Sequence, residues 1–169
     1  KLAEFFYIPG IALGTSAATF SSQNFGAGER ARIAKGARSG IFMYFCWWLV
    51  ALVFVIFLAP TAVKFITGSS NPEVIKNGVL YLRISIPMIP PMAILVILRN
   101  ILQGMRRPGM PLFCSCLELS GKVIFALWLV PAFGYLAVCI CEPVTWVICC
   151  VVIAVAVFAI RGEFTNRHI

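Results

Sequence analysis

The sequence predicts an all-α fold: a polytopic integral membrane helix bundle with about five transmembrane helices. Of its 169 residues, 61% are hydrophobic and only 12% are charged, and the mean hydropathy is +0.96. Soluble domains carry about 25% charged residues, so this chain has too little polar surface to cover a globule in water. Its charged groups are also separated by uncharged stretches long enough to cross a bilayer, which takes about 20 residues.

The first predicted span covers approximately residues 3–24. It lies in a run of 24 uncharged residues between Glu4 and Glu29. Because glycine readily leaves helical geometry, we expect the helix to end in the stretch from Gly26 to Gly28. We expect a basic loop to follow it, with the cationic residues Arg30, Arg32, Lys35 and Arg38.

The second predicted span, approximately 39–63, is a run of 25 uncharged residues rich in Phe, Trp, Val and Leu. A polar loop follows, in which Asn71 is a candidate N-cap and Pro72 the first helical residue of the next helix. The third span, approximately 79–105, contains three prolines and one charged residue: Pro87, Pro90, Pro91 and Arg99.

The fourth predicted span covers approximately 110–131 and the fifth approximately 136–160. A short basic turn at 106–109 precedes the fourth span, and a tight turn at 131–135 joins it to the fifth. Residues 161–169 form a polar tail.

The distribution of basic residues predicts the orientation in the membrane. With five spans, eight basic residues fall on one side and four on the other. Because cytoplasmic loops carry an excess of Lys and Arg, we expect the richer side and the C-terminus to be cytoplasmic. This topology accounts for the net charge of +8, so we expect no nucleic-acid partner. The richer side consists of Arg30, Arg32, Lys35, Arg38, Arg106, Arg107, Arg161 and Arg167.

The seven cysteines all lie in apolar runs. Cys-x-Cys on a helix directs its side chains to nearly opposite faces, which does not suit a metal. We therefore expect reduced cysteines that pack as small apolar side chains, and no metal site.

The string from Ala17 to Gly28, followed by a basic stretch, resembles the second helix of the C-terminal lobe of multidrug and toxic compound extrusion (MATE) transporters. Later segments resemble the branch named for the DNA-damage-inducible transporter: Pro72–Val74, Arg99–Met105, Leu117–Leu119 and Glu142–Trp146. The residues that we assign to the family motif are Gln23, Asn24, Gly26, Gln103 and Gly104.

This resemblance implies that residues 1–169 are a partial C-terminal lobe, with helices eight to twelve of a twelve-helix, two-lobe transporter. The chain begins with Lys1, which also suggests a piece of a longer protein whose N-terminal lobe is missing. The implied protein is a multi-pass transporter of the cell (plasma) membrane and not an enzyme. No cofactor is expected.

The implied function is secondary-active multidrug export. Amphipathic, cationic organic compounds would leave the cell against an inward flux of H+ or Na+, by alternating access. Two alternatives stay open at this point: a lipid-linked saccharide flippase of the wider superfamily, and a non-transporting membrane scaffold or degenerate fragment.

Four charged residues inside predicted spans are the first candidate site: Arg99, Glu118, Lys122 and Glu142. An ionised group at the centre of a span costs about 2.5–3.5 kcal/mol or more, so such groups normally pair. The hairpins that join the third, fourth and fifth spans bring these residues to similar depths, and we expect one chain of alternating charges. That chain is either a structural clasp for three helices or a proton or cation relay used in coupling.

Pro87, Pro90 and Pro91 are the second candidate site, because each removes a backbone donor and must kink or break its helix. The break is either a hinge or cavity wall, as in transporters with broken helices, or a packing kink. Gln23 and Asn24 are either a latch for the cytoplasmic mouth or an ordinary helix end. A cluster of aromatic residues faces either a cationic drug or lipid: Phe42, Tyr44, Phe45, Trp47 and Trp48.

Overall fold

The computed structural model describes residues 2–68, 70–160 and 162, and these residues form helices and no strands. The predicted all-α membrane helix bundle is thereby confirmed. The helices, with a 3₁₀ turn η1 and a π-helical turn η2, are α1 (Leu2–Gly26), α2 (Arg30–Thr67), α3 (Pro72–Ser85), η1 (Ile86–Met88), α4 (Ile89–Gly104), α5 (Gly109–Ile124), η2 (Phe125–Leu129), α6 (Val130–Phe133) and α7 (Tyr135–Ala159).

Four helical segments of the described residues are long and apolar enough to cross a membrane. They are α2, the continuous segment from Pro72 to Gly104, the segment from Gly109 to Phe133, and α7. α1 is not among them, because hydroxyl and amide side chains such as Thr15, Thr19 and Gln23 fill its second half. A fifth span over 3–24 therefore stays a prediction.

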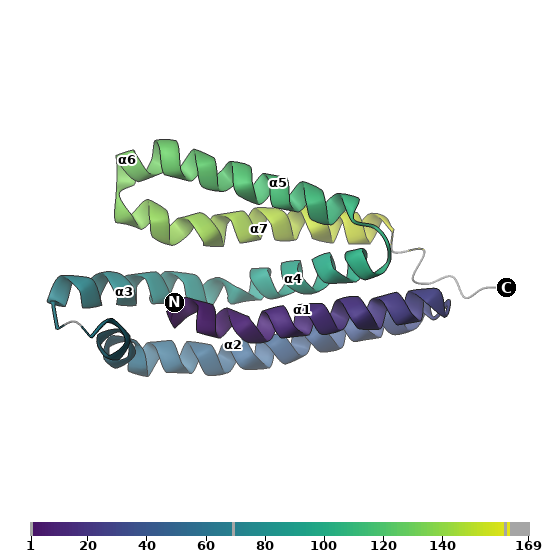
Figure 1. The fold of residues 1–169 in the computed structure, drawn as a ribbon, viewed down its shortest axis with the longest axis horizontal. Helices are drawn as coiled ribbons and strands as arrows, with labels where there is room; N and C mark the ends of the chain where they lie inside the picture. Colours follow the sequence, from purple (N-terminus) through teal and green to yellow (C-terminus); the bar gives the residue numbers. More distant parts are fainter. Residues whose placement is uncertain (1, 69, 161, 163–169) are drawn as a thin grey trace.

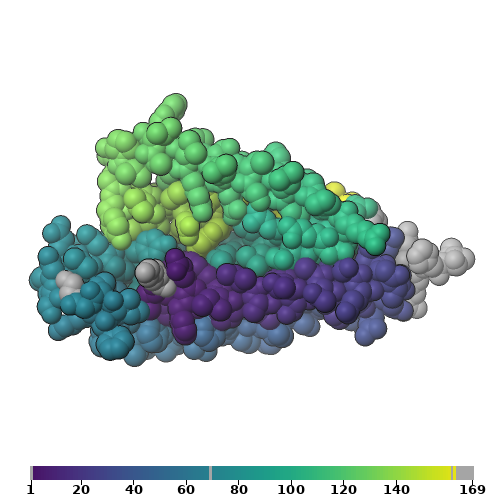
Figure 2. Space-filling view, in the orientation of Figure 1, coloured from purple at the N-terminus to yellow at the C-terminus, as the bar shows by residue number. Residues whose placement is uncertain are grey.

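The helices lie side by side as a bundle (Figure 1). α1 packs against α4 and α2, and α7 packs against α4 and α5. The front face of the bundle shows α1 across its lower half with α2 along the edge below it, and α5 toward the upper edge (Figure 2). The α1–α2 turn, the α4–α5 turn and the end of α7 lie together at one end, which we call the basic end (Figure 1). Its described cationic residues are Arg30, Arg32, Lys35, Arg38, Arg106 and Arg107.

The basic stretch after α1 is helical, which corrects the loop expected there. α2 begins at Arg30, and the turn that joins it to α1 is confined to 27–29. Ala, Arg and Lys are strong helix formers, so the cationic residues extend the spanning helix beyond its apolar part. Arg161 and Arg167, which also entered the charge count, lie outside the described residues.

The start of α3 confirms the predicted cap. Asn71 is the N-cap residue and its Oδ1 accepts a hydrogen bond from the backbone N–H of Glu73 at 2.9 Å. Pro72 is the first helical residue, where its missing N–H leaves no intrahelical bond unmade.

The seam between α1 and α4 is closely packed near the basic end. A Cβ added to Gly104 would collide with Ser21 Oγ and with the carbonyl oxygen of Ala18. Ser21 is fully buried, and its hydroxyl donates to the carbonyls of Ala18 at 3.0 Å and Ile101 at 3.3 Å. Gly104 therefore sets how closely the end of α4 approaches α1.

Candidate functional site

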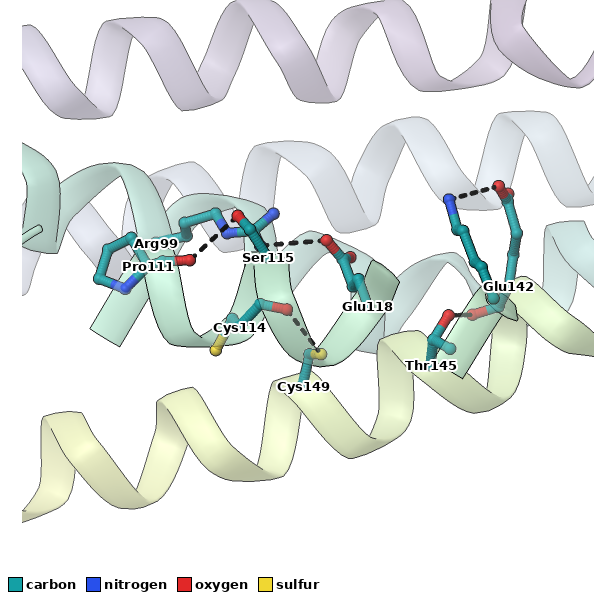
Figure 3. Close-up of polar contacts among 9 residues, drawn as sticks. Arg99, Pro111, Cys114, Ser115, Glu118, Glu142, Thr145 and Cys149 are labelled. Carbon is teal, nitrogen blue, oxygen red and sulfur yellow. Dashed lines mark hydrogen bonds and ion pairs between the residues drawn. The ribbon is translucent and has the colours of Figure 1, made fainter. Parts of the chain in front are cut away.

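Arg99 of α4 and Glu118 of α5 form an ion pair, with Nη2 of Arg99 3.0 Å from Oε2 of Glu118. The same Nη2 lies 3.1 Å from Ser115 Oγ, whose hydroxyl in turn donates to the carbonyl of Pro111 at 3.1 Å. The two charged side chains are 19% and 22% exposed. Figure 3 shows Ser115 beside the arginine, one helical turn from the carboxylate. We call this group the Arg99 pair.

Lys122 of α5 and Glu142 of α7 form the second ion pair, with Nζ 3.3 Å from Oε1. Their side chains are 50% and 33% exposed, so this pair is the more accessible. Thr145, one turn along α7 from Glu142, keeps its hydroxyl on the backbone carbonyls of Cys141 and Glu142 and leaves the carboxylate to the lysine (Figure 3). We call this group the Lys122 pair.

The two pairs are separate within the described part of the chain, unlike the continuous chain of charges expected from the sequence. Glu118 and Lys122 are one turn apart on α5, but the lysine extends to α7 and the carboxylate to α4. Each pair therefore ties α5 to a different neighbour. Below the Arg99 pair, Cys149 Sγ of α7 donates to the carbonyl of Cys114 at 3.6 Å, and both cysteines are fully buried.

Pro87 lies within η1, where the α3–α4 segment departs from α-helical geometry, and Pro90 and Pro91 follow in the first turn of α4. Pro90 has no N–H for the carbonyl of Ile86, and that carbonyl accepts instead from Trp48 Nε1 of α2 at 3.0 Å. Ile89 N–H is a second donor to it. A side chain of the neighbouring helix thus donates to a carbonyl that the break leaves short of a helical donor. The sequence did not reveal this role of Trp48.

Two buried hydroxyls near this break were also missed. Tyr7 Oη of α1 and Ser85 Oγ of α3 are both buried and form no hydrogen bond of ordinary geometry among the described residues, although they lie near each other and near Tyr81. Ser85 immediately precedes η1, and the ring of Tyr7 packs edge-on against Trp146 of α7, 5.5 Å between centroids. Buried hydroxyls normally have partners, so this part of the bundle is less completely bonded than the part around Ser21.

The family-motif residues at the end of α1 fall into two kinds. Asn24 is buried, and its side-chain Nδ2 donates to the backbone carbonyl of Phe20 at 2.7 Å. The backbone carbonyl of Asn24 accepts a hydrogen bond from the N–H of Glu29 at 2.8 Å. Gln23 and Gly26 are exposed. Asn24 therefore stabilises the turn between α1 and α2.

The motif residues at the end of α4 lie at the same end of the bundle. The side chain of Gln103 is exposed, and its backbone carbonyl accepts from Arg106 N–H at 3.0 Å. Gly104 faces α1, as described above. Arg106, which follows them, has a positive φ of 60°, a conformation that small residues adopt more readily.

The aromatic cluster does not form one surface. Phe42 and Phe45 are exposed, whereas Tyr44 is fully buried in the core. Trp47 Nε1 donates to the carbonyl of Phe6 at 3.0 Å, so it connects α2 to α1 as Trp48 connects α2 to the break.

No curated protein and no solved structure matches the chain. Among the described residues, no group of His, Cys, Asp and Glu has the arrangement of a metal site. The polar features are instead ion pairs and a broken helix inside a bundle of membrane-length helices, which suits a transporter. The MatE family model matches residues 1–128 of the 169-residue chain, and the chain therefore belongs to the MatE family of membrane transporters.

Proposed function

We propose that this chain is the C-terminal lobe of a secondary-active exporter that moves amphipathic, cationic organic compounds against an inward flux of H+ or Na+. The observation that carries the proposal is the MatE family match over residues 1–128. We place the protein in the plasma membrane with the basic end toward the cytoplasm, because six described cationic residues gather there.

The Lys122 pair is the better candidate for ion coupling. A coupling carboxylate must exchange a proton or cation with water, and Glu142 is part of the more exposed and longer ion pair. The Arg99 pair is shorter, more buried and supported by Ser115, which favours a clasp between α4 and α5. Both assignments rest on the proposed transport function.

The break at η1 is proposed as the hinge of alternating access. On the N-terminal side of the break α3 contacts α2 and α7, and on its C-terminal side α4 contacts α1, α2 and α7. A segment with prolines at three nearby positions bends with fewer intrahelical hydrogen bonds to break. The rocking motion would carry this lobe against an N-terminal lobe of the same protein.

Efflux from vesicles tests the proposal. The full gene product that contains this chain is reconstituted in proteoliposomes loaded with a fluorescent cationic dye, and an inward H+ or Na+ gradient is imposed. Gradient-dependent loss of dye is expected, and it should disappear in the Glu142→Gln variant while the Ser115→Ala variant keeps it.

Two results would contradict the proposal. Movement of a lipid-linked saccharide without dye efflux would indicate a flippase. A correctly folded protein that moves neither compound under either gradient would indicate a scaffold.

A further inference from the structure

A largely apolar groove of about 560 Å³ lies between the end of α2 and the start of α3, at the end of the bundle opposite the basic end (Figure 1). Its apolar lining includes Pro60 of α2 and Ile75, Val79 and Leu80 of α3. Lys76 and Arg83 of α3 line the same groove. An apolar groove with two cationic side chains in its lining fits a ligand that has one apolar part and one anionic part.

The two cationic residues share one face of α3. They are seven positions apart, which is about two helical turns, or ~10.5 Å along the axis at ~1.5 Å per residue. Val79 and Leu80 occupy the positions three and four residues after Lys76, between the two cations on that face. A cationic side chain therefore lies at each end of a short apolar strip.

Neither cation is neutralised within the described part of the chain. Both side chains are exposed, and no described residue forms an ion pair with Lys76 or Arg83. Glu73, the carboxylate three residues before Lys76, is exposed and is not a lining residue of the groove. The described lining thus contains two positive charges and no carboxylate.

The groove lies where the apolar part of the helices ends. A Cβ added to Gly78 would lie 2.8 Å from Val63 Cγ1, so Gly78 is level with the end of the uncharged run 39–63 in α2. Lys76 is ~3 Å from Gly78 toward the α2–α3 turn, and Arg83 is ~7.5 Å from it toward the bilayer centre. At this depth the long side chains of lysine and arginine extend to the lipid headgroups. The two cations are therefore at the level where a phosphate is available.

We propose that this groove binds one anionic phospholipid, with its phosphate between Lys76 and Arg83 and an acyl chain against Pro60 and Val79. Charge complementarity selects this occupant, because a guanidinium binds phosphate through two parallel N–H···O bonds and an ammonium adds a point charge. A zwitterionic lipid would bring a third cation to the site, and a free anion would leave the apolar lining uncovered. The inference does not depend on what the protein transports.

Lipid binding to the full gene product in detergent tests the proposal. Native mass spectrometry and thermal unfolding are measured with dioleoyl-phosphatidylglycerol and with the phosphatidylcholine of the same acyl chains. We expect a retained phosphatidylglycerol, at least tenfold weaker retention of phosphatidylcholine, and a higher Tm with phosphatidylglycerol.

Matched variants separate a site from general surface charge. Arg83→Gln is expected to weaken phosphatidylglycerol binding about tenfold, while Lys64→Gln, which removes an exposed cation at the same end of the bundle but outside the groove lining, changes it less than twofold. Val79→Phe fills the groove and should weaken binding although it changes no charge. Should Arg83→Gln fail to fold, Lys76→Gln removes the other cation at an exposed position and should weaken binding at least threefold.

Several results would overturn the proposal. Equal losses in Arg83→Gln and Lys64→Gln would show unspecific attraction, and displacement of the lipid by millimolar inorganic phosphate would show an anion site without a lipid. Lipid binding that Arg83→Gln, Lys76→Gln and Val79→Phe all leave unchanged would place the lipid elsewhere. A dimer that phosphatidylglycerol does not dissociate, and that Val79→Phe abolishes, would assign the groove to a second copy of the chain.

Discussion

The half of the bundle around Arg99 and the half around Lys122 differ in the length and burial of their ion pairs and in the regularity of their helices. At Arg99, one carboxylate and one hydroxyl bond a single guanidinium nitrogen, and a fully buried Ser21 bonds two carbonyls nearby. Nε of the same arginine is buried and has no hydrogen-bond partner among the described residues. At Lys122, the ion pair is longer and more exposed. The same half holds the broken helix at η1, the π-helical turn η2 and the hydroxyls of Tyr7 and Ser85, which form no hydrogen bond of ordinary geometry with a described residue.

This difference indicates a division of labour between the two halves. Short, buried hydrogen bonds and ion pairs favour a single arrangement, because movement leaves their donors and acceptors unpaired. Where helix geometry is irregular and buried hydroxyls lack hydrogen bonds, a shift of the helices breaks fewer hydrogen bonds and costs less free energy. We therefore expect the half at the basic end to hold the helices together and the other half to move.

Removing one carboxylate from each pair should give the largest difference. Glu118→Ala leaves Arg99 in a largely buried site without its counter-ion, and we expect a loss of about 3 kcal/mol in unfolding free energy. Glu142→Ala leaves Lys122 without its counter-ion in a more exposed position, and we expect a smaller loss of unfolding free energy. Thermal unfolding of both variants in the same detergent measures the difference. Equal destabilisation would remove the contrast between the pairs.

Exchanging the charges within each pair sharpens the comparison. Arg99→Glu with Glu118→Arg should restore folding and transport relative to either single change, as a clasp requires. Lys122→Glu with Glu142→Lys should restore folding but not transport, because the carboxylate that exchanges an ion has moved to another helix. Expression, Tm and gradient-driven dye efflux are compared for both double variants. Transport by the Lys122 exchange would argue against coupling at that pair.

The fold was largely predictable from the sequence, since charge spacing and apolar runs fix where membrane helices lie. The cap at Asn71 was predictable because a local motif determines it. The helical conformation at the start of α2 was not predictable, because a basic stretch after glycines is typical of both a loop and a helix end. Only the packing of Ile33 in the core distinguishes them.

The candidate site was predictable in part. Helix hairpins place residues at known depths, which brings Arg99 near Glu118 and Lys122 near Glu142, but helix rotation decides which partner each one bonds. The loss of the helical donor to the Ile86 carbonyl at Pro90 was predictable, whereas its partner Trp48 lies 38 residues away and depends on tertiary packing. Nothing in the sequence marked Tyr7 and Ser85, because an unmade hydrogen bond has no local pattern.

The proline break should have a moderate effect, and on transport more than on folding. Replacing Pro87, Pro90 and Pro91 with Ala restores three backbone donors and straightens the segment, so we expect equal helical content by circular dichroism and at least tenfold slower efflux. Trp48→Phe is the complementary change, because it removes a donor from the Ile86 carbonyl and should cost about 1 kcal/mol. Full transport by the triple variant would make the break a packing kink.

The smallest effect is expected at the buried hydroxyls, and its sign distinguishes the two halves. Tyr7→Phe and Ser85→Ala remove groups that form no hydrogen bond of ordinary geometry with a described residue, so each should leave Tm unchanged or raise it. Ser21→Ala is the matched change in the bonded half; it removes a fully buried hydroxyl that bonds the Ile101 carbonyl and should cost about 1 kcal/mol. A loss at Ser85→Ala as large as at Ser21→Ala would mean that an ordered water or a neighbouring tyrosine hydroxyl already bonds Ser85, and the buried hydroxyls would then not distinguish the two halves.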